Sequence, residues 1–417
     1  MGEQKSILII GGGISGITTA IEAAEAGYDT TIVERNPYLG GRVAQLFKYF
    51  PKLCPPYCGL EMNFRRIRQN PKVKFYTLSE VGSISGGEGD FKVSIKVNAR
   101  YVNEKCTACG KCVEVCPAER SNDYNFGMDN TKAIYRPHDM AFPMRYVIDE
   151  QACKGSACSE CVKVCKYGAI DLDMKPSTIE LNAGSIVTAT GWNPYDATKM
   201  ENLGFGKIKN VITNMMMERL SAPNGPTKGK IKRPSDGKDV QSIAFVQCAG
   251  SRDENHLSYC SAVCCMASMK QSTYIREKNP ESKVYIFYID IRTPGKYEDF
   301  LNRIQSDENI KMIKGKVAKI EEDSDGGAIV TAEDIVGGGK VHQKVDMVVL
   351  AAGMESALKN NGLVSTIKTE ESGFVISEGQ TEGIYAAGVA GRPNDVTTSV
   401  QGATGAALKS IQSLVRR

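Results

Sequence analysis

Eight cysteines between Cys106 and Cys165 constrain this chain more strongly than any other feature of its sequence. The first four, which end in Cys116-Pro117, follow the pattern C-x2-C-x2-C-x3-C-P. This spacing lets one tight turn present three thiolates to an iron–sulfur cube, while the fourth reaches the other cube of a two-cluster module. The second four open with four intervening residues and have Lys166 in place of the proline. Crossed ligation predicts one set made of Cys106, Cys109, Cys112 and Cys165, and another made of Cys153, Cys158, Cys161 and Cys116.

Zinc sites and disulfides are the alternative uses of these cysteines. Zinc ribbons favour paired C-x2-C knuckles over triples followed by C-P. Disulfides suit secreted chains, whereas an apolar run that begins at Ile7 leaves no room for a signal peptide. No apolar run approaches the ~20 residues of a membrane span, and a net charge of +4 with both signs abundant implies neither a nucleic acid nor a membrane surface as partner. We therefore expect a cytoplasmic protein with no membrane span of its own, whose cysteines serve metal or redox chemistry.

Residues 7–34 predict a strand, a helix and a second strand. The turn after the first apolar run is Gly11-Gly12-Gly13-Ile14-Ser15-Gly16, and the second strand ends at Glu34. In a G-x-G-x-x-G turn the first glycine reverses the chain, the second lets a pyrophosphate approach the backbone, and the third lets the helix pack on the strand. The helix N-terminus favours the phosphate charge, and Glu34 is placed to accept hydrogen bonds from ribose hydroxyls. The segment therefore predicts a dinucleotide site.

The residues after Glu34 indicate FAD rather than NAD. Arg35 leads to Gly40-Gly41-Arg42, and paired glycines with an arginine shortly after the ribose acid resemble the continuation found in flavoproteins. Three strand-to-turn segments resemble parts of reductases with two dinucleotide-binding domains, and they end in Ala189-Thr190-Gly191, Gly353 and Gly388. The expected flavin contacts also include Val81, Val389, Asp395 and Thr398. The alternative is that these segments are only buried strands of an α/β sheet.

The end of the chain departs from the flavoprotein pattern at one position. Val389 stands where such proteins carry an acid after the glycine, and Asp395 is expected to substitute for it. A helix from Ser399 is expected to present its N-terminus to the flavin.

The cysteine quartets interrupt the flavin domain, because strand-like residues precede and follow them. The sequence predicts an FAD-binding Rossmann domain in three parts, residues 1–97, 177–236 with a linker, and 346–417. A two-cluster ferredoxin-like domain of α+β type occupies 98–176, and a second Rossmann-like domain with a cysteine-rich site occupies 237–345. The predicted fold is therefore an α/β flavoprotein with two dinucleotide-binding domains, like thioredoxin reductase, and an inserted ferredoxin domain. We expect His138 and the basic stretch 228–233 to be solvent-exposed.

The second α/β unit lacks the fingerprint of a nicotinamide site. Its first strand leads into Gln247-Cys248 and continues to Arg252 without G-x-G-x-x-G, which argues against NAD(P)H as the electron donor. In its place is the spacing C-x11-C-x3-C-C, formed by Cys248, Cys260, Cys264 and Cys265. By ligand rules alone, buried core cysteines or a zinc site explain this set as well as a cluster does. Arg252 and His256 are close enough in sequence to tune such a site.

Cys54 and Cys58 form a further pair whose spacing, C-x3-C, is standard neither for a cluster nor for a thioredoxin-type site. The two prolines between them predict a stiff turn. The pair is either two sheltered thiols or a redox-active dithiol or extra cluster ligands, which would make these two the candidate catalytic residues.

Together these motifs resemble the flavin-containing A subunit of heterodisulfide reductases. The resemblance is carried by GGGISG, NPYLGGRVAQL, PKLCPPYCGL, the double-ferredoxin insert and the C-x11-C-x3-C-C set, and it covers nearly the whole chain. At this length, without the extra terminal cluster regions of the methanogen form, the chain is most similar to the A subunit of the quinone-interacting membrane-bound oxidoreductase complexes of sulfate reducers. The resemblance implies that Cys248, Cys260, Cys264 and Cys265 hold a third [4Fe–4S] cluster beside FAD.

The same resemblance implies the protein's partners. They are sister subunits, among them a quinone-reactive membrane subunit together with a second flavin and iron–sulfur protein, and adenylylsulfate reductase is the electron partner. The chain would then associate with the membrane peripherally, through these subunits. We expect an electron-transfer subunit that relays electrons, with bifurcation or confurcation at FAD left open. The alternatives are an NAD(P)H-dependent reductase of the glutamate synthase small-subunit type and a scaffold with a structural flavin.

Overall fold

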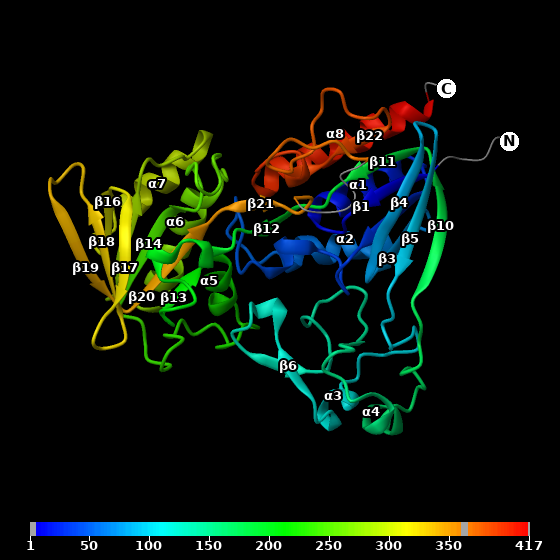
Figure 1. Cartoon of the computed structure of the whole chain (residues 1–417), viewed down its shortest axis with the longest axis horizontal. Helices are drawn as coiled ribbons and strands as arrows, with labels where there is room; N and C mark the ends of the chain where they lie inside the picture. Colours follow the sequence, from blue (N-terminus) through cyan, green and yellow to red (C-terminus); the bar gives the residue numbers. More distant parts are fainter. Residues whose placement is uncertain (1–5, 360–365, 416–417) are drawn as a thin grey trace. The chain divides into compact units, whose positions relative to one another are not determined.

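The computed structural model describes residues 6–359 and 366–415, which form two compact units (Figure 1). Unit 1 contains Met1–Trp192, Ser356–Arg392 and Val396–Arg417, and unit 2 contains Asn193–Glu355 and Pro393–Asp395. Among the described residues, no helix combines the length and the apolar composition needed to cross a bilayer.

Unit 1 is built on a parallel sheet of five strands. Their order is β22 (Ile384–Ala386), β11 (Ser185–Thr188), β1 (Ile7–Ile10), β2 (Thr30–Glu34) and β3 (Val73–Thr77). In the centre, Ile7 pairs with Ser185 on one side and with Thr30 on the other. Every residue of β1 and β2 is buried, as expected for parallel strands that are covered on both faces.

Different elements cover the two faces of this sheet. The helices α1 (Ile14–Glu25), α2 (Tyr57–Gln69) and α8 (Val396–Val415) cover one face, where Ile9, Ile17 and Phe64 share a core. An antiparallel sheet of β10 (Ser177–Ala183), β5 (Asp90–Val97) and β4 (Ser79–Gly87) packs on the other face, where Leu8 meets Phe91. The last helix begins at Val396 and not at Ser399 as the sequence predicts.

The cysteine-rich insert leaves and rejoins the antiparallel sheet at one point. Val97 ends β5 and pairs with Ser177, the first residue of β10, so residues 98–176 hang from two neighbouring strand ends (Figure 1). Its helices are short, α3 (Lys111–Val115) and α4 (Glu160–Val164). Two ribbons complete it, β6 (Glu119–Ser121) with β7 (Asn130–Lys132) and β8 (Ile134–Tyr135) with β9 (Val147–Ile148). Six of the eight quartet cysteines belong to its small core, so the fold of the insert depends on them.

Unit 2 repeats the architecture of unit 1. Its parallel sheet runs in the order β13 (Val211–Thr213), β20 (Met347–Ala352), β14 (Ser242–Ala249), β15 (Lys283–Tyr288) and β16 (Ile310–Lys314). Its antiparallel sheet consists of β17 (Val317–Glu322), β18 (Ala328–Glu333) and β19 (Lys340–Val345), and its helices are α5 (Asn214–Ser221), α6 (Cys264–Lys278) and α7 (Glu298–Gln305). In each unit the central strand, β1 or β14, leads into the helix that follows it, α1 or α6.

Unit 2 is larger than the sequence predicts. Val211 of β13 pairs with Val348 of β20, and Met347 of β20 pairs with Ile243 of β14. Residues 193–236 and 346–355 therefore lie in unit 2 and not in the flavin domain. The sequence misplaces this boundary because a short, fully buried apolar strand has the same pattern whichever parallel sheet it joins.

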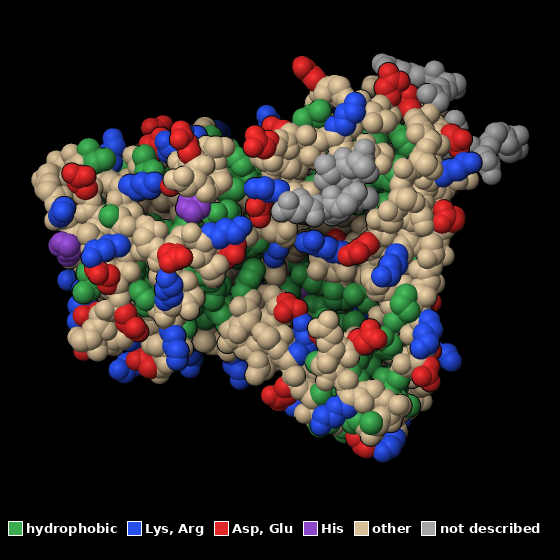
Figure 2. Space-filling model, in the orientation of Figure 1, with side chains coloured by type: hydrophobic (Ala, Val, Ile, Leu, Met, Phe, Trp, Pro, Cys, Tyr) green, Lys and Arg blue, Asp and Glu red, His purple; other side chains and the backbone are tan. Residues whose placement is uncertain are grey.

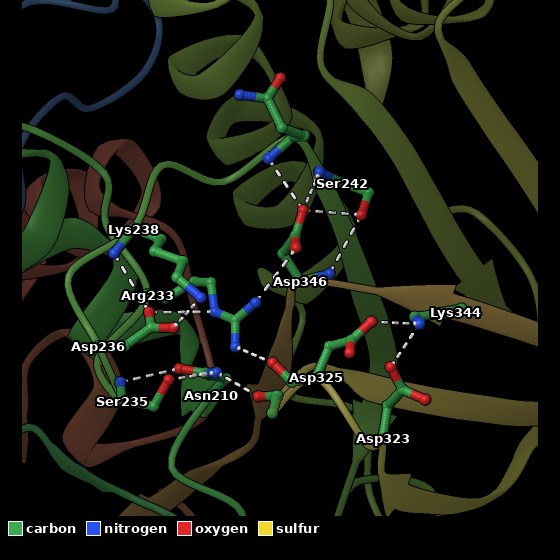
Figure 3. A network of polar contacts seen from close by, with 12 residues as sticks. Asn210, Arg233, Ser235, Asp236, Lys238, Ser242, Asp323, Asp325, Lys344 and Asp346 are labelled. Atoms are coloured by element: carbon green, nitrogen blue, oxygen red, sulfur yellow. Dashed lines mark hydrogen bonds and ion pairs between the residues drawn. The ribbon is translucent and has the colours of Figure 1, made fainter.

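The basic stretch 228–233 is exposed only in part, because Lys228 and Lys230 are exposed whereas Arg233 is only 6% exposed. Its guanidinium donates to the carbonyl of Asp325 at 2.8 Å and lies 3.3 Å from the carboxylate of Asp236 and 3.5 Å from that of Asp346 (Figure 3). The local charge predicted exposure, but the carbonyl of Asp325 and the carboxylate of Asp346, both distant in the sequence, hold this arginine in unit 2. Figure 2 shows the acidic and basic side chains that do lie on one face of the molecule, where the two signs are interspersed.

Candidate cofactor sites

The turn from Gly11 to Gly16 joins β1 to α1 with little room for side chains. A Cβ on Gly11, whose φ is +110°, would lie 2.3 Å from the carbonyl oxygen of Ala189. A Cβ on Gly16 would lie 1.9 Å from the carbonyl oxygen of Gly11. At Gly13, in contrast, the nearest atom would be the Cα of Gly41 at 3.9 Å, so the backbone is accessible there. A tight turn with open backbone at a helix N-terminus fits a pyrophosphate.

The predicted ribose acid, Glu34, lies beside this turn. Its carboxylate accepts the backbone N–H of Gly12 at 2.7 Å, and both the backbone N–H and the side-chain amide of Asn36 at 2.7 Å. Burial raises the pKa of Glu34, while these hydrogen bonds oppose the rise. Since a carboxylate offers about four lone-pair sites, one acceptor position remains for a ribose hydroxyl.

The second glycine pair packs directly against the first turn. Gly40 bridges to Gly13 and donates its N–H to the carbonyl of Gly12 at 2.8 Å. Gly41 begins the 3-10 turn η1 (Gly41–Gln45), and a Cβ on it would lie 2.8 Å from the Cα of Gly13. The Gly11–Gly16 turn and the Gly40–Gly41 pair therefore form one continuous wall.

Arg42 projects from this wall toward the chain's single tryptophan, Trp192. Its Nε donates to the carbonyl of Trp192 at 3.3 Å, and its guanidinium carbon lies 5.8 Å from the centre of the indole ring. Burial lowers the pKa of Arg42, and a nearby anionic cofactor would favour the charged form. Sequence reasoning missed Trp192, although it directly follows the predicted contacts Thr190 and Gly191.

Two buried hydroxyls lie at the end of β11 and just after it, next to the Gly11–Gly16 turn. The side-chain oxygens of Thr188 and Thr190 are buried without a hydrogen-bond partner among the described residues. Gly388, at φ +60°, lies so close to the start of α1 that a Cβ on it would be 2.0 Å from Oγ of Ser15. Because an unsatisfied buried hydroxyl is costly, these positions fit a ligand rich in hydroxyls and carbonyls, as FAD is.

The remaining predicted flavin contacts are spread more widely. Val81 lies in β4 and is buried in the core between the antiparallel and parallel sheets. Val389 is buried in the 3-10 turn η8 (Gly388–Ala390), and Thr398 lies in the first turn of α8. Asp395 immediately precedes that helix. Gly353 belongs to unit 2, where a Cβ on it would lie 2.4 Å from Oγ of Ser251. It therefore packs on the cysteine-bearing loop of that unit.

In the insert, one pocket collects cysteines from both quartets. The pocket is partly open to solvent, and its apolar walls include Ile134 and Leu172. Its four thiols come from Cys116, Cys153, Cys158 and Cys161. This is one of the two crossed sets that the spacing predicts.

The electrostatics of the thiols follow the same grouping. Burial raises the pKa of Cys161, and the thiolates of Cys153 and Cys116 raise it further. In the other set, burial raises the pKa of Cys112 to about 12, with Cys106 and Cys109 adding to the rise. Thiolates gathered in this way repel one another, and iron ions would remove that repulsion.

Cys106, Cys153 and Cys260 begin turns of the same kind. In each turn the Sγ accepts the backbone N–H of the residue two positions later, at 3.4, 3.4 and 3.3 Å. The three donors all have positive φ, with values of 55°, 60° and 62°, and they are Ala108, Gly155 and Ala262. Hydrogen bonds to sulfur help to set the properties of iron–sulfur clusters. The backbone that wraps the insert's cysteines therefore recurs in unit 2.

The unit 2 cysteines gather where β14 ends and α6 begins. Cys264 and Cys265 are the first residues of α6 and are buried, and Cys248 lies near the end of β14. Burial raises the pKa of Cys264, and the thiolates of Cys248, Cys265 and Cys260 add to the rise in that order. This site has the same topological position in unit 2 that the Gly11–Gly16 turn has in unit 1.

Two charged or polar neighbours were expected at this site. Arg252 lowers the pKa of Cys248, against the larger effect of burial, and is ion-paired with Asp290. His256 is instead engaged by Tyr195, whose hydroxyl lies 2.9 Å from its Nδ1. The structure therefore brings Arg252 to the thiols.

Cys54 and Cys58 share Tyr49 as a neighbour. Burial raises the pKa of Tyr49, and both thiolates contribute to the rise. Cys58 is exposed near the start of α2, and Cys54 is half-buried.

Within the described ranges, no three Cys, His, Asp or Glu side chains meet closely enough to hold a single metal ion. A [4Fe–4S] cube spreads its thiolates around a larger body, so its ligands need not meet at one point.

The expectation for His138 is wrong. It is 7% exposed and stacks on Tyr124 at 4.9 Å between ring centres, with Tyr38 edge-on at 5.3 Å. The backbone carbonyl of Tyr124 also accepts a hydrogen bond from Gln45 at 3.3 Å. The arm between the quartets is thus packed on the flavin-binding part of unit 1, a long-range contact that local polarity could not indicate.

Family models match two parts of the chain. Residues 6–53 match the FAD dependent oxidoreductase family, and residues 105–170 match the 4Fe-4S dicluster domain. They confirm the predictions of FAD and of two clusters in the insert.

Curated relatives match nearly the whole chain. The A subunit of the H2:CoB–CoM heterodisulfide,ferredoxin reductase of Methanothermobacter thermautotrophicus is 39% identical over 98% of this chain and 64% of that protein. The iron–sulfur A subunit of the CoB–CoM heterodisulfide reductase of Methanocaldococcus jannaschii is 40% identical over 97% of this chain and 63% of its own length. The chain thus spans a little under two thirds of the length of these relatives.

A solved structure confirms the fold class. Thioredoxin reductase from Lactococcus lactis aligns with a TM-score of 0.55 and 16% identity, over 99% of this chain and 100% of that protein. At this identity the likeness concerns the fold alone.

Proposed function

We propose that this chain relays electrons between protein partners. Nearly the whole chain is homologous to the A subunit of heterodisulfide reductases, which is an oxidoreductase subunit with FAD and iron–sulfur clusters. In this role it has no small-molecule substrate of its own. FAD exchanges electrons singly or in pairs, whereas each cluster takes one.

The observation that carries this proposal is the replacement of the nucleotide turn in unit 2. In folds of this type a dinucleotide binds where the central strand meets the following helix. Unit 1 has Gly11 to Gly16 at that position, and unit 2 has Cys248, Cys264 and Cys265 there. Thiols in place of glycines suit a metal cluster and remove the backbone approach that a pyrophosphate needs.

A third [4Fe–4S] cluster at this position is part of the proposal. The Cys260 turn supports it, because its N–H to sulfur bond and positive φ match those of Cys106 and Cys153 in the insert. Arg252 would supply positive charge beside Cys248. Cys264 and Cys265 would ligate from the N-terminal end of α6, which favours negative charge.

The partners are proposed from the sequence resemblance. They are a second protein with flavin and iron–sulfur clusters, a quinone-reactive membrane protein that gives peripheral attachment to the membrane, and adenylylsulfate reductase or a related protein of sulfur metabolism as electron partner. The relatives' names instead mention the CoB–CoM heterodisulfide and ferredoxin. Reoxidation of the reduced protein by each of these acceptors would separate the two assignments.

An anaerobic titration tests whether nicotinamide is the donor. Purified holoprotein is titrated with NADH, with NADPH and with dithionite, while flavin and cluster bleaching is followed. The relay predicts full bleaching by dithionite and none by the nucleotides. Stoichiometric bleaching at low nucleotide concentration would favour a reductase of the glutamate synthase small-subunit type. A flavin that dithionite cannot reduce would favour a structural role.

A further inference from the structure

Arg100 joins three segments of unit 1. Its Nε donates to the carbonyl of Tyr146 at 3.0 Å, and its Nη1 donates to the hydroxyl of Thr77 at 3.1 Å. Its Nη2 donates to the carbonyls of Pro37 at 2.9 Å and Arg145 at 3.2 Å. Thr77 ends β3 and Pro37 follows β2, whereas Tyr146 and Arg145 lie between the two quartets. One side chain therefore fastens the insert to the dinucleotide-binding sheet.

The charge of Arg100 is buried without a carboxylate partner. The residue is 7% exposed, and its four hydrogen-bond acceptors are all neutral. In residues 6–359 and 366–415, no carboxylate forms an ion pair with it. Burial lowers the pKa of Arg100 to about 10, repulsion from Arg145 adds to the fall, and the anions of Tyr135 and Cys106 oppose it. A buried cation in this position is costly unless a negative charge compensates it.

Arg120 of the same insert is an arginine whose charge is compensated by carboxylates. Its guanidinium pairs with Asp149 at 2.7 Å and also with Asp123, and it lies 4.7 Å above the ring of Tyr135. Both Arg120 and Arg100 lower the pKa of Tyr135, against the larger effect of burial. Of these two arginines, Arg120 alone has its charge balanced by carboxylates.

The first quartet is the anionic group that the fold offers to Arg100. A thiolate at Cys106 raises the pKa of Arg100, although burial has the larger, opposite effect. Tyr146, whose carbonyl Arg100 holds, places its hydroxyl 3.7 Å from where a Cβ of Gly110 would lie, in the turn between Cys109 and Cys112.

We propose that Arg100 is the counter-charge of the cluster held by the crossed set of Cys106, and that it selectively raises the reduction potential of this cluster. Reduction adds one negative charge to an already anionic thiolate-ligated cluster, so a fixed cation nearby stabilises the reduced state more than the oxidised state. The inference rests on the two clusters of the insert and does not depend on the identity of the electron partners.

The test is an EPR-monitored potentiometric titration of the full chain, with iron and sulfide assayed first. The signal lost in Cys109→Ser identifies the first cluster, and the signal lost in Cys158→Ser identifies the second. In Arg100→Gln, the midpoint potential of the first cluster should fall by at least about 59 mV, which corresponds to a tenfold change in the equilibrium constant of a one-electron reduction. The second midpoint should stay in place.

Three variants separate the charge of Arg100 from its anchoring role. Arg120→Gln is the matched control and should leave both midpoints unchanged, because it removes an arginine that is already paired. Arg100→Lys keeps a cation but not the planar fork, and Thr77→Val removes one neutral acceptor. Both should keep the first midpoint near that of the wild type while lowering thermal stability.

Several results would overturn the proposal. Unchanged midpoints in iron-replete Arg100→Gln would do so, as would an equal fall in Arg100→Lys. If Arg100→Gln loses its iron, Arg100→Lys decides alone, and a tenfold shift in its first midpoint would reject the counter-charge. If Cys109→Ser and Cys158→Ser each keep the full iron content of the wild type, the two-cluster insert itself is rejected, and this proposal with it.

Discussion

Cys116 and Cys161 belong to different quartets in the sequence, yet they line the same pocket of the insert. Each quartet ends in a cysteine that lies just after a short helix, α3 or α4. The helix α3 lies between Cys116 and the turn that carries the first cysteines of its quartet, and Cys116 lines the pocket of the second quartet. This grouping is the one that crossed ligation predicts for the second set.

Crossed ligation predicts an unusual pattern of double mutants. Cys116→Ser and Cys161→Ser should each remove about four irons, and the double variant should remove no more than either change alone. Cys116→Ser combined with Cys109→Ser should remove about eight irons, although both residues lie in the first quartet. Iron assay and EPR on anaerobic protein measure both. The reverse pattern would mean that each quartet loads its own cluster.

Gly16→Ala should abolish FAD binding. The added methyl would lie 1.9 Å from the carbonyl oxygen of Gly11 and would push α1 away from β1. Gly405→Ala is the matched control, because nothing lies within 4 Å of its Cβ on α8, and it should gain up to ~1 kcal/mol in helix propensity. The absorbance ratio of flavin to protein measures the outcome. Full flavin content in Gly16→Ala would show that the turn does not hold the cofactor.

Glu218→Ala should destabilise unit 2 strongly. The buried carboxylate of Glu218 pairs with Lys270 at 3.0 Å and accepts hydrogen bonds from Gln271 at 2.7 Å and Tyr274 at 3.1 Å. Removing it leaves a buried cation without its carboxylate, which costs ~3–5 kcal/mol. Urea unfolding followed by circular dichroism should show this loss. The exposed Glu281→Ala should change the free energy of unfolding by less than about 0.5 kcal/mol, and an equal effect in both variants would contradict the role of the buried pair.

Asp307 should contribute to stability at neutral pH but not in strong acid. Hydrogen bonds from Arg276, at 2.8 and 3.0 Å, lower the pKa of Asp307 below its usual 3.8. A folded-state pKa below the unfolded value stabilises the protein above the unfolded pKa, and this contribution is lost as the pH falls through the folded value. Unfolding midpoints measured from pH 7 to pH 2.5 should therefore fall less steeply below pH 4 in Asp307→Asn than in the wild type. Identical slopes, with Glu308→Gln as the exposed neighbour control, would count against the pair.

The sequence was most informative where chemistry depends on neighbours along the chain. Turns of glycine or cysteine have fixed spacings, so Gly11 to Gly16 and Cys106 to Cys116 could be assigned without a structure. The set in unit 2 could not be derived in this way, because Cys248 comes from the strand and Cys264 from the helix that follows a long loop.

Features that depend on distant partners escaped sequence reasoning. Arg233 and His138 looked like surface residues, since their carboxylate and aromatic neighbours come from other segments. The strand before Gly353 was assigned to the flavin domain but lies in unit 2, because β20 has the apolar pattern of any buried parallel strand. Arg100 carried no local signal at all, as its acceptors include carbonyls up to 63 positions away.

Iron, acid-labile sulfide and FAD, assayed on the same anaerobically purified protein, test the central claim most directly. The account predicts one flavin site and three cysteine sets, and therefore about twelve irons and twelve sulfides per FAD. About eight of each would keep the clusters of the insert and remove the one proposed at Cys248, Cys260, Cys264 and Cys265. About four of each, or zinc in place of sulfide-bearing iron, would contradict the two-cluster insert and the electron relay built on it.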